Sequence, residues 1–336
     1  MIKQWIGQVT LAATIAFGAT GLQAEEMDTL NFGIISTEST QNLKSVWDPF
    51  LADMSRQLDM EVKGFFAPDY AGIIQGMRFD KVDIGWFGNK SAMEAVDRAG
   101  GEIIAQTVAA DGSPGYWSLM IVHKDRDDLN NVDDILENAS ELTFGNGDPN
   151  STSGYLVPGY YVFGKNGVMA KEIFKRTLNS GHETNALAVA NGQVDVATFN
   201  TESMERLEIT APEQAAKLKV VWKSPLIPSD PIVIRSNLPE QTREKVRDFL
   251  MTYGTTGDER EVQILADLQW APFRESSNDQ LLPIRQLALF RERSMIEADD
   301  SYSAAEKQQL MSEIDAKLAA LDQRMAAIDE EKAKAE

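Results

Sequence analysis

The segment 145–154 has the residue types of a receptor for a small anion. Ser151, Thr152 and Ser153 follow two glycines and a proline, and a run that could enter a helix begins at Tyr155. The first turn of a helix offers unpaired backbone N–H groups, and the helix dipole favours negative charge there. The hydroxyl groups add uncharged donors, so the pattern predicts an oxyanion site. The lysine of a P-loop is missing, and an ordinary N-cap by Ser or Thr is the alternative interpretation.

The reactive residue types do not assemble into a recognisable catalytic set. The chain has two histidines, His123 and His182, and no cysteine, so thiolate chemistry is removed and few zinc ligands remain. His182 follows a glycine at the start of a predicted helix and could donate to an anion there; a surface-loop histidine is the alternative. Carboxylates are abundant, so counting alone does not exclude a carboxylate hydrolase. The sequence favours a binding protein with no catalytic residue, metal or cofactor.

Acidic and aromatic residues stand near the same predicted strand ends. Glu202 follows one strand, and Asp230 lies in the proline-flanked segment 228–231. Carboxylates would repel a purely anionic ligand in a low-dielectric cleft, but they suit a ligand that also carries an ammonium group. Tyr70 and Tyr116 lie next to turn residues and could cover such a cation. Solvated surface acids and core aromatics are the alternatives.

One structural unit occurs twice in the chain. Residues 73–86 and 186–198 each read as a short helix, a polar turn and a strand that begins Val-Asp-hydrophobic. Strands that alternate with helices predict a mainly parallel sheet. Ligands of such sheets bind beyond the carboxyl ends of the strands, here at 86–89 and 199–202. The repeat therefore predicts two α/β lobes with a ligand between them.

An apolar segment and a proline-rich segment on either side of the second unit predict how the lobes are connected. An apolar run over 116–124 is suited to pass from the first lobe to the second, and the return lies near 220–228, where prolines favour a stiff hinge. We expect lobe 1 to comprise 27–118 with 229–290, and lobe 2 to comprise 119–228. Over 291–336 we expect a helical extension, opened by a capping box at Ser303 and Glu306. Its apolar seam, which starts at Leu310, either packs on the body or pairs with a second chain.

The start of the chain has the pattern of an export signal. Lys3 precedes an apolar stretch over 9–20, and Ala24 ends a plausible cleavage site. A membrane anchor is the alternative, although the stretch is short for a bilayer span. Residues 1–24 therefore predict export to a bacterial periplasm. The 32 basic and 52 acidic residues give a net charge of −20, which argues against nucleic acid or an anionic membrane surface as partner.

The sequence resembles the periplasmic phosphonate-binding proteins of bacterial phosphonate ABC importers. The resemblance runs from Leu30 to about Phe290 and rests on the segments 31–39, 66–79, 109–117, 144–154 and 181–190. It implies an α/β, two-lobed type II periplasmic binding protein fold with hinge crossovers and extra C-terminal helices. It also implies a membrane permease with a cytoplasmic ATPase as partner, and dimer formation through the C-terminal helices.

The resemblance also assigns roles to positions of this sequence. For the phosphonate end, the matching positions are Ser151, Thr152, Ser153, Tyr116 and His182, and for the amino end of 2-aminoethylphosphonate they are Tyr70, Glu202 and Asp230. The leading hypothesis is a solute-binding protein for phosphonates, with 2-aminoethylphosphonate favoured. A receptor for phosphite, a phosphate ester or a sulfonate is one alternative, and a periplasmic phosphoester hydrolase is another.

Overall fold

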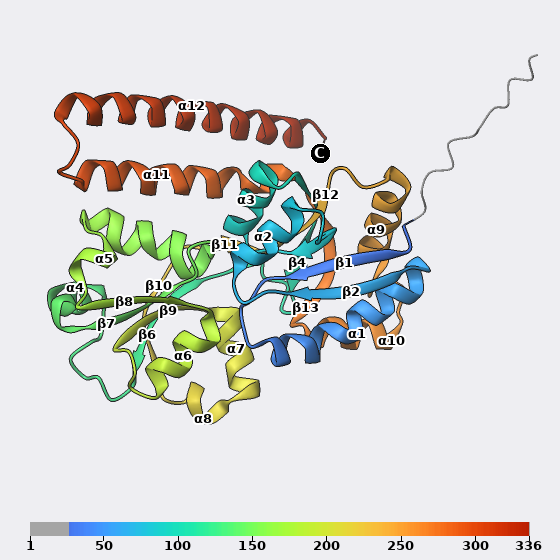
Figure 1. The fold of residues 1–336 in the computed structure, drawn as a ribbon, viewed down its shortest axis with the longest axis horizontal. Coiled ribbons are helices and arrows are strands. Elements are labelled where there is room, and N and C mark those ends of the chain that lie inside the picture. The colour runs from blue at the N-terminus through green and yellow to red at the C-terminus, as the bar shows by residue number, and fades with distance from the viewer. Residues whose placement is uncertain (1–26, 336) are drawn as a thin grey trace, which may run out of the picture.

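The computed structural model describes residues 27–335. The chain folds into two α/β lobes that lie side by side, and a pair of long helices runs along one side of both (Figure 1). The export signal predicted for 1–24 lies outside the described residues. Within 27–335, no helix combines the length and the apolar character that a membrane span requires.

The first lobe is built on a six-stranded sheet with the order β13-β4-β12-β3-β1-β2. β1 pairs in parallel with β2 and β3, whereas β12 runs antiparallel to β3 and β4. The late strands β12 and β13 complete this sheet after the chain has passed through the second lobe. Its strands are β1 (Thr29–Ile34), β2 (Glu61–Phe66), β3 (Ile84–Trp86), β4 (Gly101–Ala109), β12 (Pro231–Arg235) and β13 (Trp270–Glu275). Its helices are α1 (Thr40–Leu58), α2 (Tyr70–Arg78), α3 (Asn89–Arg98), α9 (Glu240–Thr252) and α10 (Glu259–Asp267).

The core of the first lobe follows from the helical spacing of α1. Its apolar residues Leu43, Trp47, Phe50 and Met54 recur every three or four positions and are all buried, as expected for one face of an amphipathic helix. Phe50 meets Phe32 of β1 edge to face, with ring centroids 6.2 Å apart. This packing fixes α1 against the sheet, and with it the polar turn that precedes the helix.

The second lobe repeats the plan with a five-stranded sheet in the order β10-β6-β9-β7-β8. β7 pairs in parallel with β8 and β9, and β6 runs antiparallel to β9 and β10. Its strands are β6 (Ser118–His123), β7 (Thr143–Gly147), β8 (Arg176–Ser180), β9 (Val196–Asn200) and β10 (Leu218–Lys223). Its helices are α4 (Val132–Asn138), α5 (Ala170–Ile173), α6 (His182–Ala190), α7 (Thr201–Thr210) and α8 (Pro212–Ala215), with short helical turns at Ala139–Glu141 and over 152–166.

The internal repeat is confirmed by equivalent hydrogen bonds in the two lobes. The carboxylate of Asp83 accepts the backbone N–H of Asn31 at 2.7 Å, and the N–H of Asp83 donates to the carbonyl of Asn31. Asp195 makes the same pair of bonds with Thr143, whose N–H lies 2.8 Å from the carboxylate. Each aspartate thus ties the start of its strand to the start of a neighbouring strand.

The repeat extends to the helix starts of both lobes. Counted at the same offset along the chain, Tyr70, the first residue of α2, corresponds to His182, the first residue of α6. Likewise Ser39, the N-cap of α1, corresponds to Ser151, the N-cap of the π-helical turn Thr152–Leu156. The two lobes therefore present equivalent helix N-termini at their carboxyl strand ends.

Two short strands connect the lobes. β5 (Gly115–Tyr116) and β11 (Ile227–Pro228) pair antiparallel, with Tyr116 opposite Ile227. The outgoing and returning segments therefore lie side by side, as the two-crossover prediction requires. The expected lobe limits, 27–118 with 229–290 and 119–228, stay a prediction.

The C-terminal part forms a helical hairpin. A 3-10 turn at Asn278–Leu281 leads into α11 (Leu282–Ala298), and α12 (Ala304–Ala335) returns alongside it (Figure 1). The capping box is confirmed, because the N–H of Ser303 donates to Glu306 at 2.8 Å and the N–H of Glu306 donates to the hydroxyl of Ser303 at 3.3 Å. Ile314 and Leu318 of the apolar seam are buried with Ile296 of α11. The seam therefore packs within the chain, and pairing with a second chain stays a prediction.

Candidate functional site

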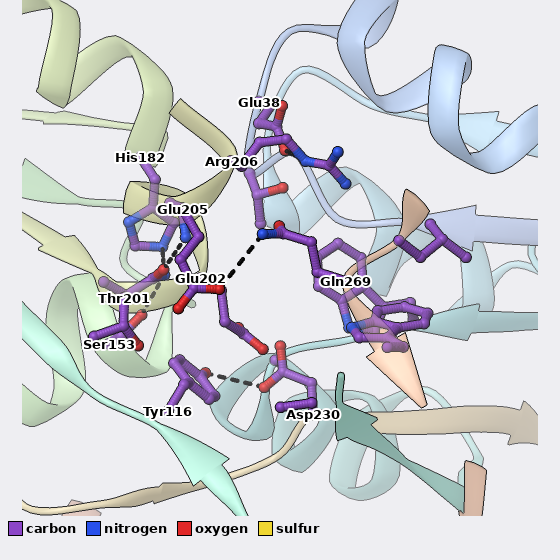
Figure 2. Close-up of a pocket in the computed structure, with 18 of the residues that line it drawn as sticks. Glu38, Tyr116, Ser153, His182, Thr201, Glu202, Glu205, Arg206, Asp230 and Gln269 are labelled. Carbon is purple, nitrogen blue, oxygen red and sulfur yellow. Dashed lines mark hydrogen bonds and ion pairs between the residues drawn. The ribbon is translucent and has the colours of Figure 1, made fainter. Parts of the chain in front are cut away.

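A cleft of about 440 Å³ lies between the lobes. Its walls contain all eight residues that the sequence assigned to a ligand: Tyr70, Tyr116, Ser151, Thr152, Ser153, His182, Glu202 and Asp230. Figure 2 shows side chains from both lobes converging on this space. The fold thus brings the predicted set together, although its members are spread over residues 70–230 of the sequence.

The hydroxyl-rich loop opens a helical segment, as the sequence predicted, but the segment is π-helical over Thr152–Leu156 and Gly159–Phe163. Single π-helical turns frequently occur at functional sites. Ser151 is its N-cap, and the Ser151 hydroxyl accepts the N–H of Gly154 at 2.9 Å. The N-cap interpretation is therefore correct for Ser151, but it accounts for only one of the three hydroxyl residues.

The other two hydroxyl groups accept hydrogen bonds from outside the loop. Thr152 Oγ1 accepts the backbone N–H of Lys90 in the first lobe at 2.8 Å. Ser153 Oγ accepts from the side-chain amide of Asn200 at 3.1 Å. With Ser151, each of the three oxygens already accepts an N–H, so each hydroxyl hydrogen is left to donate. The loop therefore holds three uncharged hydroxyl donors at a helix N-terminus, and that of Ser151 lies 3.4 Å from Nε2 of His182.

His182 belongs to the same polar cluster. Its ring is 3% exposed, and Nε2 lies 3.4 Å from Ser151 Oγ and 3.3 Å from Asn200 Nδ2. The surface-loop alternative is therefore wrong. Burial lowers the pKa of His182 to about 4, because the charged imidazolium is disfavoured away from water. The ring is consequently neutral at physiological pH.

A buried acid lies at the opposite side of the cleft. Asp230 is 5% exposed, and Oδ1 accepts the Tyr116 hydroxyl at 3.0 Å and the Asn89 amide at 3.4 Å. Burial raises the pKa of Asp230 to about 7. Glu202 is half-buried at the start of α7, and burial together with the negative charge of Asp230 raises the pKa of Glu202 well above its usual value. The surface-acid alternative is therefore wrong for Asp230.

The two tyrosines that the resemblance assigned to opposite ends of a ligand both line the cleft. Tyr116, assigned to the phosphonate end, bonds to Asp230 among the carboxylates. Tyr70, assigned to the amino end, is buried, and its N–H donates to Asp148 at 3.3 Å. Burial and the charges of Asp230 and Asp148 raise the pKa of the Tyr70 hydroxyl, so that it keeps its proton. The end of a ligand that each tyrosine contacts stays a prediction.

Aromatic side chains form an apolar wall. Trp47, Trp86 and Trp270 all line the cleft and pack on one another with ring centroids 5.4–5.7 Å apart. The Nε1 donor of Trp86 is buried and finds no acceptor among the described residues. Phe87, which also stands at a predicted strand end, is instead fully buried in the core. Trp47 and Trp270 are buried as well, so the direction of each ring decides whether it reaches the cleft, and that direction is not visible in the sequence.

Sequence reasoning missed several polar residues that line the cleft or bond to its lining. Asn200 bonds to the hydroxyl loop, and Asn89 bonds to Asp230. Both stand at the carboxyl strand ends where the repeat predicted a ligand, so their position was a usable signal. Arg206 and Glu38, which line the cleft and pair across the lobes at 3.5 Å, gave no such signal. Arg206 is thus neutralised by a neighbouring acid.

The charged residues that line the cleft are mostly acidic. Among the lining residues Arg206 is the one basic side chain, while Glu38, Asp111, Glu202, Glu205 and Asp230 are acidic. In the part of the chain that the structure describes, no cluster of three or more His, Cys, Asp or Glu side chains is arranged to hold a metal ion. The arrangement suits a ligand with an oxyanion at one end and a cation at the other.

Two α/β lobes, two crossover strands and a polar cleft between them define a type II periplasmic substrate-binding protein. The same fold occurs in a Prochlorococcus marinus protein solved in complex with methylphosphonate, with a TM-score of 0.70 at 23% identity over 80% of this chain and 99% of that one. At that level of identity the likeness concerns the fold.

The chain belongs to the family of ABC transporter, phosphonate, periplasmic substrate-binding proteins, whose pattern matches residues 32–281. It is 60% identical over 314 residues to the phosphonates-binding periplasmic protein of Escherichia coli K12, with 92% of each chain covered. It is also similar to the crystal structure of a binding-protein component of the ABC phosphonate transporter of Pseudomonas aeruginosa. That similarity amounts to 63% identity and a TM-score of 0.89 over 90% of this chain and 100% of that one. The resemblance inferred from the sequence is therefore confirmed.

Proposed function

We propose that this protein captures phosphonates in the periplasm, with 2-aminoethylphosphonate preferred, and delivers them to an ABC importer. The observation that carries the proposal is the polarity of the cleft. Uncharged donors gather at Ser151, Thr152 and Ser153, and two acids with raised pKa values, Glu202 and Asp230, face the same space (Figure 2). The Escherichia coli relative, named for phosphonate binding, supports the ligand class.

The three hydroxyl residues at one end of the cleft explain how a protein of net charge −20 could hold an anion. Surface charges more than about 10 Å away are largely screened by salt. Donors at contact distance inside a closed cleft are screened much less. The helix dipole and the hydroxyl hydrogens of Ser151, Thr152 and Ser153 therefore outweigh the global field at this point.

The acid end explains why an amine would be preferred. The two neighbouring carboxyl groups, that of buried Asp230 and that of half-buried Glu202, resist ionisation because burial and mutual repulsion both disfavour charge. An ammonium group placed between Glu202 and Asp230 would relieve both effects. The hydroxyl-bearing rings of Tyr70 and Tyr116 would then lie against the cation. A ligand without an amine leaves the carboxyl groups of Glu202 and Asp230 without a positive counter-charge.

Titration calorimetry with 2-aminoethylphosphonate, ethylphosphonate and inorganic phosphate tests the proposal. We expect the amino compound to bind tightest and phosphate weakest. Phosphate binding as tight as that of the amino compound would refute the amino-end assignment. Ethanesulfonate binding tighter than ethylphosphonate would instead favour the sulfonate alternative.

Replacing the carboxylate of Glu202 isolates its contribution. In Glu202→Gln we expect the affinity for 2-aminoethylphosphonate to fall about ten- to a hundredfold, because one charge-assisted bond of roughly 1.5–3 kcal/mol is lost. The affinity for ethylphosphonate should change little. Glu208→Gln is the matched control, since exposed Glu208 lies on the same helix and does not line the cleft. Equal losses for both ligands would contradict the assignment.

The remaining proposals concern the whole protein. We propose that residues 1–24 direct export with cleavage near Ala24, and that lobe 1 comprises 27–118 with 229–290 and lobe 2 comprises 119–228. A membrane permease with a cytoplasmic ATPase is the proposed receptor of the loaded protein. Dimer formation through the extension 291–336 is proposed as well. Mass spectrometry of the secreted protein tests the cleavage, and sedimentation of the chain with and without 291–336 tests the dimer.

A further inference from the structure

Asn200 occupies a junction between the two ends of the cleft. It is the last residue of β9 and the N-cap of α7, and its side chain is 4% exposed. Oδ1 accepts the backbone N–H of Ser203 at 2.7 Å. A backbone N–H only donates, so this bond fixes which end of the amide is oxygen. The NH₂ group must therefore point the other way, toward the hydroxyl loop.

The NH₂ group of Asn200 contacts two groups of the oxyanion end, the part of the cleft formed by residues 151–153 and His182. It donates to Ser153 Oγ at 3.1 Å and lies 3.3 Å from His182 Nε2. Because an NH₂ group has no acceptor capacity, the nitrogen that faces it must present a lone pair. The proton of the neutral His182 ring then sits on Nδ1, which is buried and has no hydrogen-bond partner among the described residues. Asn200 thereby selects one tautomer of the ring.

We propose that Asn200 is the positioning residue of the oxyanion end, which holds His182 as the Nδ1–H tautomer and directs the Ser153 hydroxyl into the cleft as a donor. This inference rests on the proposed phosphonate function. It assigns His182 a role that differs from the anion donor expected from the sequence: Nε2 acts as an acceptor. The bonds to Nε2 from Ser151 and Asn200, at 3.4 and 3.3 Å, are long, so a stronger donor can take the lone pair.

An acceptor at this point has a consequence for specificity. A singly ionised phosphonate carries one P–OH group, which can donate to Nε2 of His182. A sulfonate is fully ionised and carries no such hydrogen. Its oxygen would face the lone pair of Nε2, and neither group could donate. A buried acceptor left without a donor is costly, so the site should reject sulfonates in favour of phosphonates of the same size.

The tautomer is measured directly by NMR on ligand-free, ¹⁵N-labelled protein. The chain has two histidines, and His123→Gln leaves His182 as the single imidazole signal. Two-bond ¹H–¹⁵N correlations should show a neutral ring with the proton on Nδ1. A ring that is predominantly Nε2–H in the otherwise unchanged protein would overturn the inference. This measurement involves no phosphonate, so it stands even if the proposed function fails.

Variants of Asn200 separate positioning from stability. Asn200→Ser keeps an N-cap oxygen for Ser203 but removes the NH₂ group, and serine caps helices about as well as asparagine. We expect a folded protein with a lower melting temperature, because buried Ser153 Oγ and His182 Nε2 lose a donor. We also expect a mixture of His182 tautomers and about tenfold weaker binding of ethylphosphonate and 2-aminoethylphosphonate alike. Asn200→Asp, which also caps, should move the proton to Nε2 because a carboxylate then faces it. Variants with the tautomer of the unmodified protein would overturn the inference.

Calorimetry with ethylphosphonate and ethanesulfonate completes the test. The unmodified protein should prefer the phosphonate by at least about 100-fold, because a site built around a hydrogen bond rejects the analogue that cannot make it. In Asn200→Ser this ratio should shrink, since part of the population then offers Nε2–H to the sulfonate. An unchanged ratio together with an altered tautomer would refute the role of Nε2 as the discriminating acceptor. Failure of both ligands to bind the unmodified protein would refute the phosphonate function itself.

Discussion

At the scale of single residues, the proton on Asp230 links ligand capture to pH. Burial raises the pKa of Asp230 to about 7, and Glu202 nearby also has a raised pKa. An ammonium group binds the ionised carboxylate, so 2-aminoethylphosphonate must displace a proton below about pH 7. Its affinity should therefore fall by up to tenfold for each pH unit below that value. Ethylphosphonate carries no ammonium, so the ratio of the two affinities isolates the effect.

Calorimetry at about pH 5.5 and about pH 7.5, in two buffers of different ionisation enthalpy, measures both the ratio and the released proton. In Asp230→Asn the ratio should lose most of its pH dependence. A ratio in the unmodified protein that is equal at both pH values would contradict the linkage. The folding stability of the ligand-free protein depends on pH in the opposite direction to the affinity for 2-aminoethylphosphonate. The pKa of Asp230 is raised from 3.8 to about 7 on folding, so the ligand-free protein should lose stability as pH rises through this window.

At the scale of elements, the paired aspartates of the repeat differ in burial. The side chain of Asp83 is 4% exposed and pairs with Arg235 at 2.6 Å, whereas that of Asp195 is 35% exposed and pairs with Arg126 at 2.8 Å. Breaking a buried ion pair by removing one charge costs about 3–5 kcal/mol, but a solvated pair contributes about 1 kcal/mol or less. Asp83→Asn should therefore destabilise the protein more than Asp195→Asn.

Urea denaturation of the two variants compares equivalent positions with the same chemical change. Asparagine keeps the oxygen that accepts the strand N–H, from Asn31 or Thr143, so the difference reports the charge pair. Equal losses of stability would show that burial of the pair does not set its contribution.

The same repeat shows how far the sequence could predict this site. The Val-Asp-hydrophobic pattern recurs because in each unit the aspartate bonds to the backbone of a neighbouring strand. The two lobes, and the strand ends at which a ligand is expected, were therefore predictable. The partners of Asn200 were not, because its amide spans β9, α7 and the hydroxyl loop, which meet only in the fold. The π-helical turns after Ser151 were not predictable either, since the sequence carries no distinct period for them. Propensity and spacing are local, whereas these contacts are not.

At the scale of the whole molecule, the helix N-terminus of the first lobe holds an anion, as we propose for the second lobe. In the first lobe the anion is part of the protein. Glu183 of α6 accepts the N–H of Ser39 at 2.6 Å and the side-chain amide of Asn42 at 2.7 Å, at the start of α1. Ser39 corresponds to Ser151 in the repeat, and α1 has no acidic residue in its own first turn. Glu183 thus occupies in lobe 1 the place that the proposed phosphonate occupies in lobe 2.

This contact joins the two lobes, so opening of the cleft would break it. Removing its charge in Glu183→Gln should destabilise the closed state by about 1 kcal/mol, the typical net contribution of one hydrogen bond, because the Ser39–Glu183 bond is exposed to solvent. If the ligand-free protein is mostly open, the apparent affinity falls by the whole of that difference, roughly fivefold. Because Glu183 does not line the cleft, the affinities for 2-aminoethylphosphonate and ethylphosphonate should fall by the same factor. In Glu202→Gln, by contrast, mainly the affinity for the amino compound should fall.

Calorimetry with both ligands measures this effect, and small-angle X-ray scattering of the loaded protein measures closure. Glu213→Gln is the matched control, because exposed Glu213 of α8 changes the charge of the same lobe. That variant should bind as the unmodified protein does. A Glu183→Gln protein with full affinity, or with a loss confined to the amino compound, would show that lobe closure does not depend on this internal anion.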